Sequence, residues 1–108
     1  MRVQKIKPIR EDKENMEKVT FKSFPVYYEK EKSGIKNNTV RRWEIFDKRF
    51  EILEQFENGF IEELFIEIVN TETKESFIRK VKDISHFGIA GVDFIITWDN
   101  EEVKNEEN

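Results

Sequence analysis

The apolar residues of this chain are mostly of types that favour β-sheets. The 108-residue sequence contains 13 Ile, 10 Phe and 8 Val, but 2 Leu and 1 Ala. Ile, Val and Phe suit the pleated, half-buried surface of a strand, whereas Leu and Ala are among the best helix formers. This bias disfavours a helical bundle or a coiled coil and favours a small sheet-based domain. A chain of this length is expected to form one domain with one core.

The composition also excludes several kinds of protein. The chain has no cysteine, which removes disulfide frameworks, thiol nucleophiles and cysteine-based zinc sites. No apolar run approaches the ~20 residues that span a bilayer. The basic segment Met1–Arg10 lacks the apolar stretch of a secretory signal. We therefore expect a cytoplasmic protein with no membrane partner.

Positive and negative charges are separated along the chain. Residues 1–50 carry 14 Lys and Arg against 8 Asp and Glu, whereas residues 51–108 carry 5 against 15. The net charge of −4 disfavours indiscriminate binding of nucleic acid. The basic half can still present a local phosphate-binding patch, and the alternative is an ordinary solvated surface.

Alternation, capping residues and turn signals predict five strands and two short helices. A proline in the first turn and Gly34 as the left-handed cap delimit the first helix, and Asp47 caps the second. Strands are expected over residues 19–23, 39–45, 61–69, 76–84 and 93–98, with helices over 24–33 and 48–56.

These elements predict one α+β domain over residues 19–98, between a polar arm (1–18) and an acidic, disordered tail (99–108). We expect a small, mostly antiparallel and partly closed β-barrel with one or two short helices. Closing the sheet, or covering it with helices, is the way to bury both the Leu64/Ile66/Ile68 face and the strand Asp93–Trp98.

One segment carries a specific pattern, G-x-K-x-x-T-x-R, between the first helix and the second strand. Gly34 allows a positive φ, which turns Lys36 back toward the strand. Thr39 and Arg41 are two residues apart and share one strand face, which Trp43 would continue. Ammonium, guanidinium and indole groups suit the phosphate or carbonyl and the base of a nucleotide-like ligand. In the alternative interpretation, Arg41 pairs with a core-edge Glu and Trp43 fills the barrel.

The motif resembles that of the ASCH family, a branch of the PUA-like β-barrels, in which a helix ending in glycine precedes the same pattern at the start of a strand. The resemblance covers residues 19–98, and residues 24–41 also look like small ASCH-like proteins of bacteriophages. It implies a barrel that binds RNA, or a nucleotide or nucleoside, in a cleft formed at the motif. The expected ligand-binding residues are Gly34, Lys36, Thr39, Arg41 and Trp43.

The same resemblance implies a second function. Some small ASCH enzymes remove an acyl group from a modified cytidine with the Lys and Thr of this motif and a downstream Glu. Lys36 would then be the base or the orienting charge, and Thr39 the nucleophile or the holder of the attacking water. No Glu lies between Glu75 and Glu101, so the third group is not assigned.

A third hypothesis is a phage-type inhibitor that binds a host protein through its negative half.

His86, the only histidine, has no cysteine or second histidine to accompany it, so we expect neither a metal site nor a catalytic triad. It is expected in a loop, and no cofactor is expected. Among the motif residues, Arg41 should be the most sensitive to substitution, because lysine cannot copy its two-point contact with a ligand.

Overall fold

The computed structural model of the protein describes residues 17–103, which fold into five strands, two α-helices and one 3-10 turn. In chain order these are β1 (Glu17–Ser23), α2 (Pro25–Ser33), β2 (Asn38–Arg42), α3 (Lys48–Glu57), β3 (Leu64–Asn70), β4 (Ser76–Phe87), η2 (Ile89–Gly91) and β5 (Asp93–Trp98). The strands form one sheet in the order β1-β3-β4-β5-β2. β1 pairs with β3 in parallel, and every other neighbouring pair is antiparallel.

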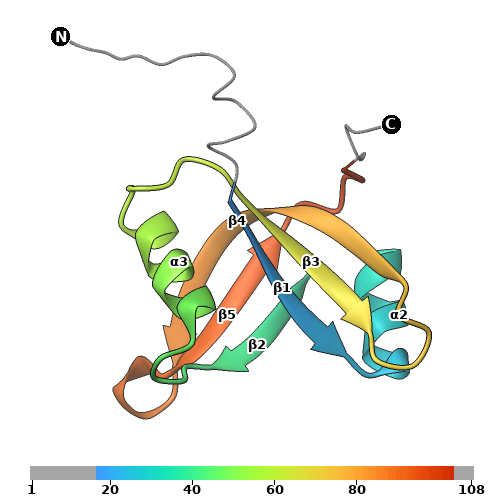
Figure 1. Cartoon of the computed structure of the whole chain (residues 1–108), viewed down its shortest axis with the longest axis horizontal. Helices are drawn as coiled ribbons and strands as arrows, with labels where there is room; N and C mark the ends of the chain where they lie inside the picture. The colour runs from blue at the N-terminus through green and yellow to red at the C-terminus, as the bar shows by residue number, and fades with distance from the viewer. Residues whose placement is uncertain (1–16, 104–108) are drawn as a thin grey trace, which may run out of the picture.

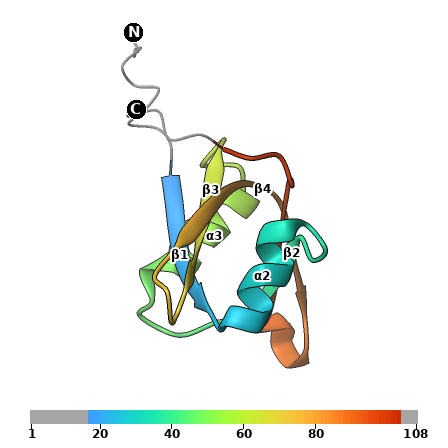
Figure 2. The same ribbon diagram turned by 90° about the vertical axis from the view of Figure 1, so that its right-hand side faces the viewer.

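The sheet curls into a half-barrel, with the helices at its two ends (Figures 1 and 2). β1 and β2 are the two edge strands of the sheet order, and they border an opening on one side of the half-barrel. The coarse expectation of an α+β domain with a mostly antiparallel, partly closed sheet and two short helices is therefore confirmed.

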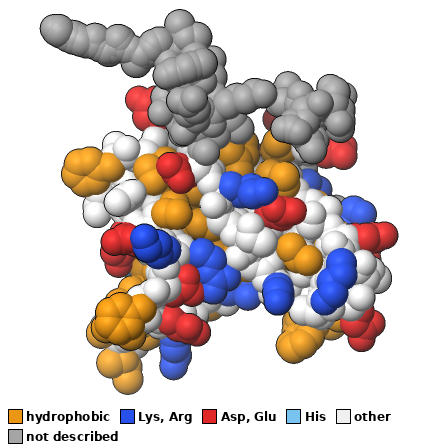
Figure 3. All heavy atoms as spheres, viewed as in Figure 1, with side chains coloured by type: hydrophobic (Ala, Val, Ile, Leu, Met, Phe, Trp, Pro, Cys, Tyr) orange, Lys and Arg blue, Asp and Glu red, His pale blue; other side chains and the backbone are white. Residues whose placement is uncertain are grey.

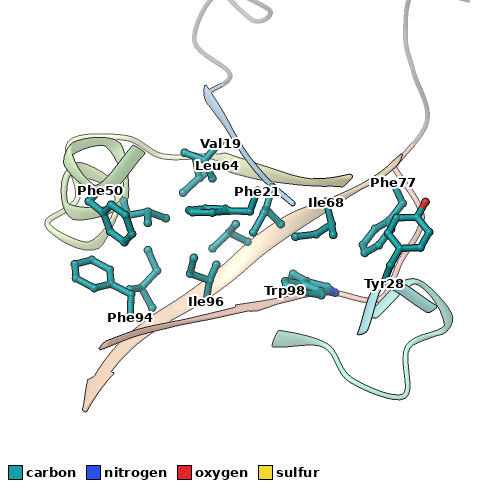
Figure 4. Packing of buried hydrophobic residues seen from close by; sticks show 14 residues of the cluster. Val19, Phe21, Tyr28, Phe50, Leu64, Ile68, Phe77, Phe94, Ile96 and Trp98 are labelled. Carbon is teal, nitrogen blue, oxygen red and sulfur yellow. The ribbon is translucent and has the colours of Figure 1, made fainter. Parts of the chain in front are cut away.

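The core fills the concave side of the curl and runs from α3 to α2 (Figure 4). Near α3, the ring of Phe50 packs edge-on against Phe21 and Phe94, with centroids 6.1 and 5.1 Å apart. Near α2, Phe77 packs against Tyr28 at 5.3 Å. Edge-to-face pairs of this kind add to the free energy gained from buried area alone. The predicted Leu64/Ile66/Ile68 face is fully buried in this core.

The local signals for the helix ends are confirmed. α2 begins at Pro25, and Gly34 follows it with φ +91°. The carboxylate of Asp47 accepts a hydrogen bond from the backbone N–H of Arg49 (3.0 Å), which caps α3 as expected. Asn58 and Gly59 then turn the chain, Gly59 with φ +87°.

Four expected strand boundaries differ from the structure by two residues or more: the start of β1, the end of β2, the start of β3 and the end of β4. β3 begins at Leu64 and not at residue 61. β1 begins at Glu17, which pairs with Leu64, so two residues of the expected arm belong to the sheet. β2 ends at Arg42 and not at residue 45, because the chain turns away before the positive φ of Phe46. β4 continues to Phe87, since β5 pairs with it to that point, and His86 therefore lies in a strand.

The ends of the chain are described only in part. Residues 1–16 of the expected arm and 104–108 of the expected tail lie outside the described residues. The start of the tail contacts the domain: the N–H of Asp99 donates to the carbonyl of Lys80 at 3.0 Å, and the Asn100 side chain lies against Gly34. Neither helix within residues 17–103 combines the length and apolar character that crossing a bilayer requires.

Candidate functional site

A hollow of about 450 Å³ lies between the end of β1, α2 and β2. We call it the motif hollow, because it brings together three of the predicted site residues, Lys36, Thr39 and Arg41. Gly34 is not among its lining residues and acts instead as the left-handed end of α2. The full lining is Lys22, Ser23, Phe24, Tyr27, Glu31, Lys36, Thr39, Val40, Arg41 and Thr71.

A buried carboxylate that the sequence analysis missed lies in this hollow. Glu31 of α2 is almost inaccessible to solvent. It accepts a hydrogen bond from the Ser23 hydroxyl at 2.9 Å and one from the Lys36 ammonium at 3.4 Å. A buried charge needs such partners to offset its desolvation. One signal was available: Glu31 lies three residues after Tyr28, which places both side chains on the buried side of α2.

Lys36 lies at the mouth of the hollow. Its backbone N–H donates to the carbonyl of Lys30 at 3.0 Å, across the turn that Gly34 makes. Its side chain is 34% exposed, so the ammonium is paired with Glu31 on one side and open to solvent on the other. The turn thus directs Lys36 toward α2, into a hollow that Thr39 and Arg41 of β2 also line.

Arg41 contacts the protein at several points. Its Nε donates to Thr39 Oγ1 at 3.0 Å, and its Nη2 donates to the Lys22 carbonyl at 2.9 Å and to the Ser23 hydroxyl at 3.1 Å. The guanidinium also lies over the ring of Phe21, 4.9 Å from its centroid. Burial lowers the pKa of Arg41, which as an arginine still stays charged. Arg41 thus ties β2 to β1 across the opening, a role that the sequence analysis did not foresee.

A second arginine bridges to the same edge strand. Arg49 of α3 donates to the Thr20 carbonyl at 2.8 Å, and its guanidinium lies 4.2 Å from the Phe21 centroid, beside Arg41. It is also paired with Asp47 at 2.6 Å. The hydrogen bond from Arg49 holds the pKa of Asp47 below its usual value. Two carbonyls on the free edge of β1 are therefore satisfied by guanidinium groups.

Aromatic side chains border the motif hollow on the α2 side. Phe24, Tyr27 and Tyr28 follow one another at helical spacing, but of the three only Tyr28 is buried. Phe24 and Tyr27 are 66% and 51% exposed. α2 therefore buries one narrow side, which carries Tyr28 and Glu31. The two remaining rings stand at the hollow.

Trp43 lies away from the motif hollow. Since β2 ends one residue before it, the strand face that Thr39 and Arg41 share does not continue to Trp43. Its backbone N–H donates to the Val92 carbonyl at 2.8 Å. Its ring lines a separate hollow beside α3, together with Phe46.

His86 joins the end of α3 to the sheet. Its Nε2 lies 2.8 Å from the Glu57 carboxylate and its Nδ1 lies 3.1 Å from the Gly91 carbonyl. Both partners are acceptors, so both ring nitrogens must donate, which requires the protonated imidazolium. The hydrogen bond that His86 donates to the Glu57 carboxylate raises the pKa of His86 above its ordinary value of 6.5. No group of three His, Cys, Asp or Glu side chains within residues 17–103 is arranged to hold a metal ion.

The chain matches no family model, no curated protein and no solved structure.

Replacing Arg41 by lysine is expected to lower the free energy of unfolding by about 1–3 kcal/mol while the domain still folds. A single ammonium cannot reach the acceptors on Thr39, Lys22 and Ser23 together. Arg42→Lys is the matched control, since Arg42 forms an exposed ion pair. Denaturant unfolding compares the two variants, and equal stabilities would contradict the bridging role of Arg41. The sequence motif also predicts that Arg41→Lys weakens ligand binding, and the ligand affinity is measured on this same variant.

The His86 contact is expected to make stability depend on pH. Because the folded-state pKa is raised, its contribution is fully present below 6.5 and is lost as the pH rises through the folded-state value. The melting temperature of His86→Gln should therefore fall below that of the parent protein near pH 5 and match it near pH 9. Glu57→Gln should show the same convergence. A gap between parent and variant that stays constant with pH would refute this.

Proposed function

We propose that the motif hollow binds a nucleotide-like ligand: a nucleoside, a nucleotide or a short stretch of RNA. The observation that carries the proposal is the position of Lys36. Its ammonium is held by the buried Glu31 at the mouth of an open hollow, which the exposed rings of Phe24 and Tyr27 also line. The resemblance of the motif to that of the ASCH family, with its PUA-like barrel, supports the same ligand class.

Each group around the hollow has a matching role in this proposal. The Lys36 ammonium attracts a phosphate or a base carbonyl, and stacking of a planar base on Tyr27 or Phe24 contributes about 1–3 kcal/mol. Arg41 acts as a positioning residue, because it holds the Thr39 hydroxyl and the end of β1 in place. Among residues 17–103, its Nη1 makes no hydrogen bond, so this nitrogen is open to a ligand.

Glu31 sets the charge of the site. Its buried carboxylate offsets part of the charge of Lys36, which favours a ligand with one phosphate or with a polar base over a highly charged polyanion. The net negative charge of the whole chain also disfavours binding of a highly charged polyanion. We therefore expect moderate affinity that weakens with salt.

Lys36→Ala is expected to weaken binding of cytidine and uridine nucleotides about tenfold to a hundredfold, the loss of one charged hydrogen bond. Lys30→Ala is the matched control, because Lys30 is an exposed lysine of the adjacent helix α2 with a side chain outside the hollow. Tyr27→Ala should weaken binding similarly, and Phe60→Ala, an exposed phenylalanine elsewhere, should not. Calorimetric titration gives the affinities. Equal affinities of Lys36→Ala and Lys30→Ala would remove the motif hollow as the site.

The contact between Glu31 and Lys36 favours a second candidate function, amidohydrolysis of an acylated cytidine. Sequence reasoning sought the carboxylate downstream of the motif, whereas Glu31 lies upstream and is bonded to Lys36 at 3.4 Å. In this mechanism Glu31 accepts a proton from a water that Thr39 helps to hold. The water oxygen bonds to the acyl carbon, the amide C–N bond breaks, and Lys36 donates a proton to the departing nitrogen.

N4-acetylcytidine distinguishes the two functions. If the protein is a hydrolase, chromatography will show equal amounts of cytidine and acetate, and Glu31→Gln and Lys36→Ala will each abolish turnover. If it is a binding module, the nucleoside will remain intact while calorimetry detects its binding. Intact nucleoside after prolonged incubation with folded protein would therefore exclude the enzyme and leave the binding proposal standing.

A further inference from the structure

Exposed apolar side chains gather at the end of the molecule away from α2. They come from the β2–α3 connection and from the end of β4 with the β4–β5 connection that follows it. We call them together the loop patch: Trp43, Ile45, Phe46, Phe87 and Ile89. Phe46 is 95% exposed and Ile89 is 92% exposed. Hydrophobic side chains protrude at the lower left of Figure 3, where these two connections lie in Figure 1. An apolar patch rimmed by polar groups is typical of an interaction surface.

The two connections are tied into one preformed surface. The N–H of Trp43 donates to the carbonyl of Val92 at 2.8 Å. Beside it, Arg42 binds both oxygens of Asp93 at 2.9 and 3.1 Å. A surface held in this way loses little conformational freedom when a partner covers it.

The most exposed ring of the loop patch belongs to a residue with a strained backbone. Phe46 has φ +70°, in the left-handed region that bulky residues rarely adopt. Because the Phe46 side chain is exposed, its burial contributes no free energy that would offset this strain. Strained, exposed residues of this kind are concentrated where proteins bind ligands and partners.

The charges beside the patch define the chemistry of its partner. A hollow of about 380 Å³ next to Phe46 is lined by the ring of Trp43 and by several α3-side carboxylates. Glu44, Glu51 and Glu54 form no ion pair with any residue from 17 to 103. Lys48 is the single cation in the lining. An electronegative hollow with two aromatic rings suits a lysine or arginine side chain, and it repels nucleic acid and anionic lipid.

We propose that the loop patch is a docking surface for a protein segment that is both apolar and basic. One basic side chain of the partner enters the hollow between Trp43 and Phe46, where the free carboxylates pair with it. Apolar side chains of the partner cover Phe46 and Ile89. The patch shares no residue with the motif hollow, so this inference is independent of the proposed function.

The test uses two labelled peptides of about 14 residues, an amphipathic peptide of Leu and Lys and the same peptide with Glu in place of Lys. We expect fluorescence anisotropy to detect binding of the Lys peptide alone. Phe46→Gly and Ile89→Ser should each weaken it about tenfold or more. Phe60→Ser, which removes a phenylalanine 81% exposed outside the patch, should leave it unchanged. Phe46→Gly should also raise the melting temperature, because glycine relieves the strain at φ +70°.

Several results would overturn the proposal. These are no binding of the Lys peptide, equal binding of the Glu peptide, or equal losses in Phe46→Gly and Phe60→Ser. Sedimentation that shows a dimer abolished by Phe46→Gly would assign the patch to a second copy of the chain. Binding to phosphatidylcholine–phosphatidylglycerol vesicles, lost in the same variant, would assign it to a membrane. A lowered melting temperature of Phe46→Gly would make Phe46 a structural residue.

Discussion

The guanidinium of Arg41 connects the two strands that the sheet leaves unpaired. β1 and β2 are the two edges of the sheet, and within the described strands no backbone ladder joins them across the opening. Arg41 supplies donors to the β1 carbonyl of Lys22 and to Ser23, and Arg49 supplies one to Thr20. Exposed edge groups invite pairing with other chains, and these arginines occupy them. The half-barrel is thus closed by side chains where a complete barrel would use a strand pair.

The same bridge shapes the motif hollow. Thr39 and Ser23 belong to different strands, and Arg41 holds their hydroxyl groups at the two sides of the opening. Ser23 in turn donates to Glu31, which pairs with Lys36. A chain of polar contacts therefore runs from the sheet edge to the mouth of the hollow. Because buried polar groups depend on all their partners, loss of one contact in this chain weakens the other contacts.

The charge separation along the sequence has a counterpart in space. Arg41 and Arg49, from the basic half, lie at the β1–β2 opening, whereas Glu51 and Glu54 of the acidic half line the hollow beside the loop patch. The two proposed surfaces accordingly suit ligands of opposite charge. We propose a nucleotide-like anion for the motif hollow and a basic protein segment for the loop patch.

Local signals in the sequence determined a large part of this structure. The β-rich apolar composition, the alternation in Leu64–Asn70, Gly34 as a helix end and Asp47 as a cap predict the five strands and two helices, because each depends on neighbouring residues. The pattern also brought Lys36, Thr39 and Arg41 to one place, since a glycine turn and a two-residue strand spacing act locally.

Only the tertiary structure decided the rest. The partners of Glu31 and the β1 acceptors of Arg41 lie 5 to 19 positions away in the sequence, and the strand position of His86 depends on pairing with β5, so no spacing rule states them. Trp43 does not share the face of Thr39 and Arg41, because β2 ends at Arg42. The Trp43 N–H donates to the Val92 carbonyl instead. The sequence thus determined which elements form, whereas packing of distant strands determined which side chains meet, because contact energies between strands depend on the whole curl of the sheet.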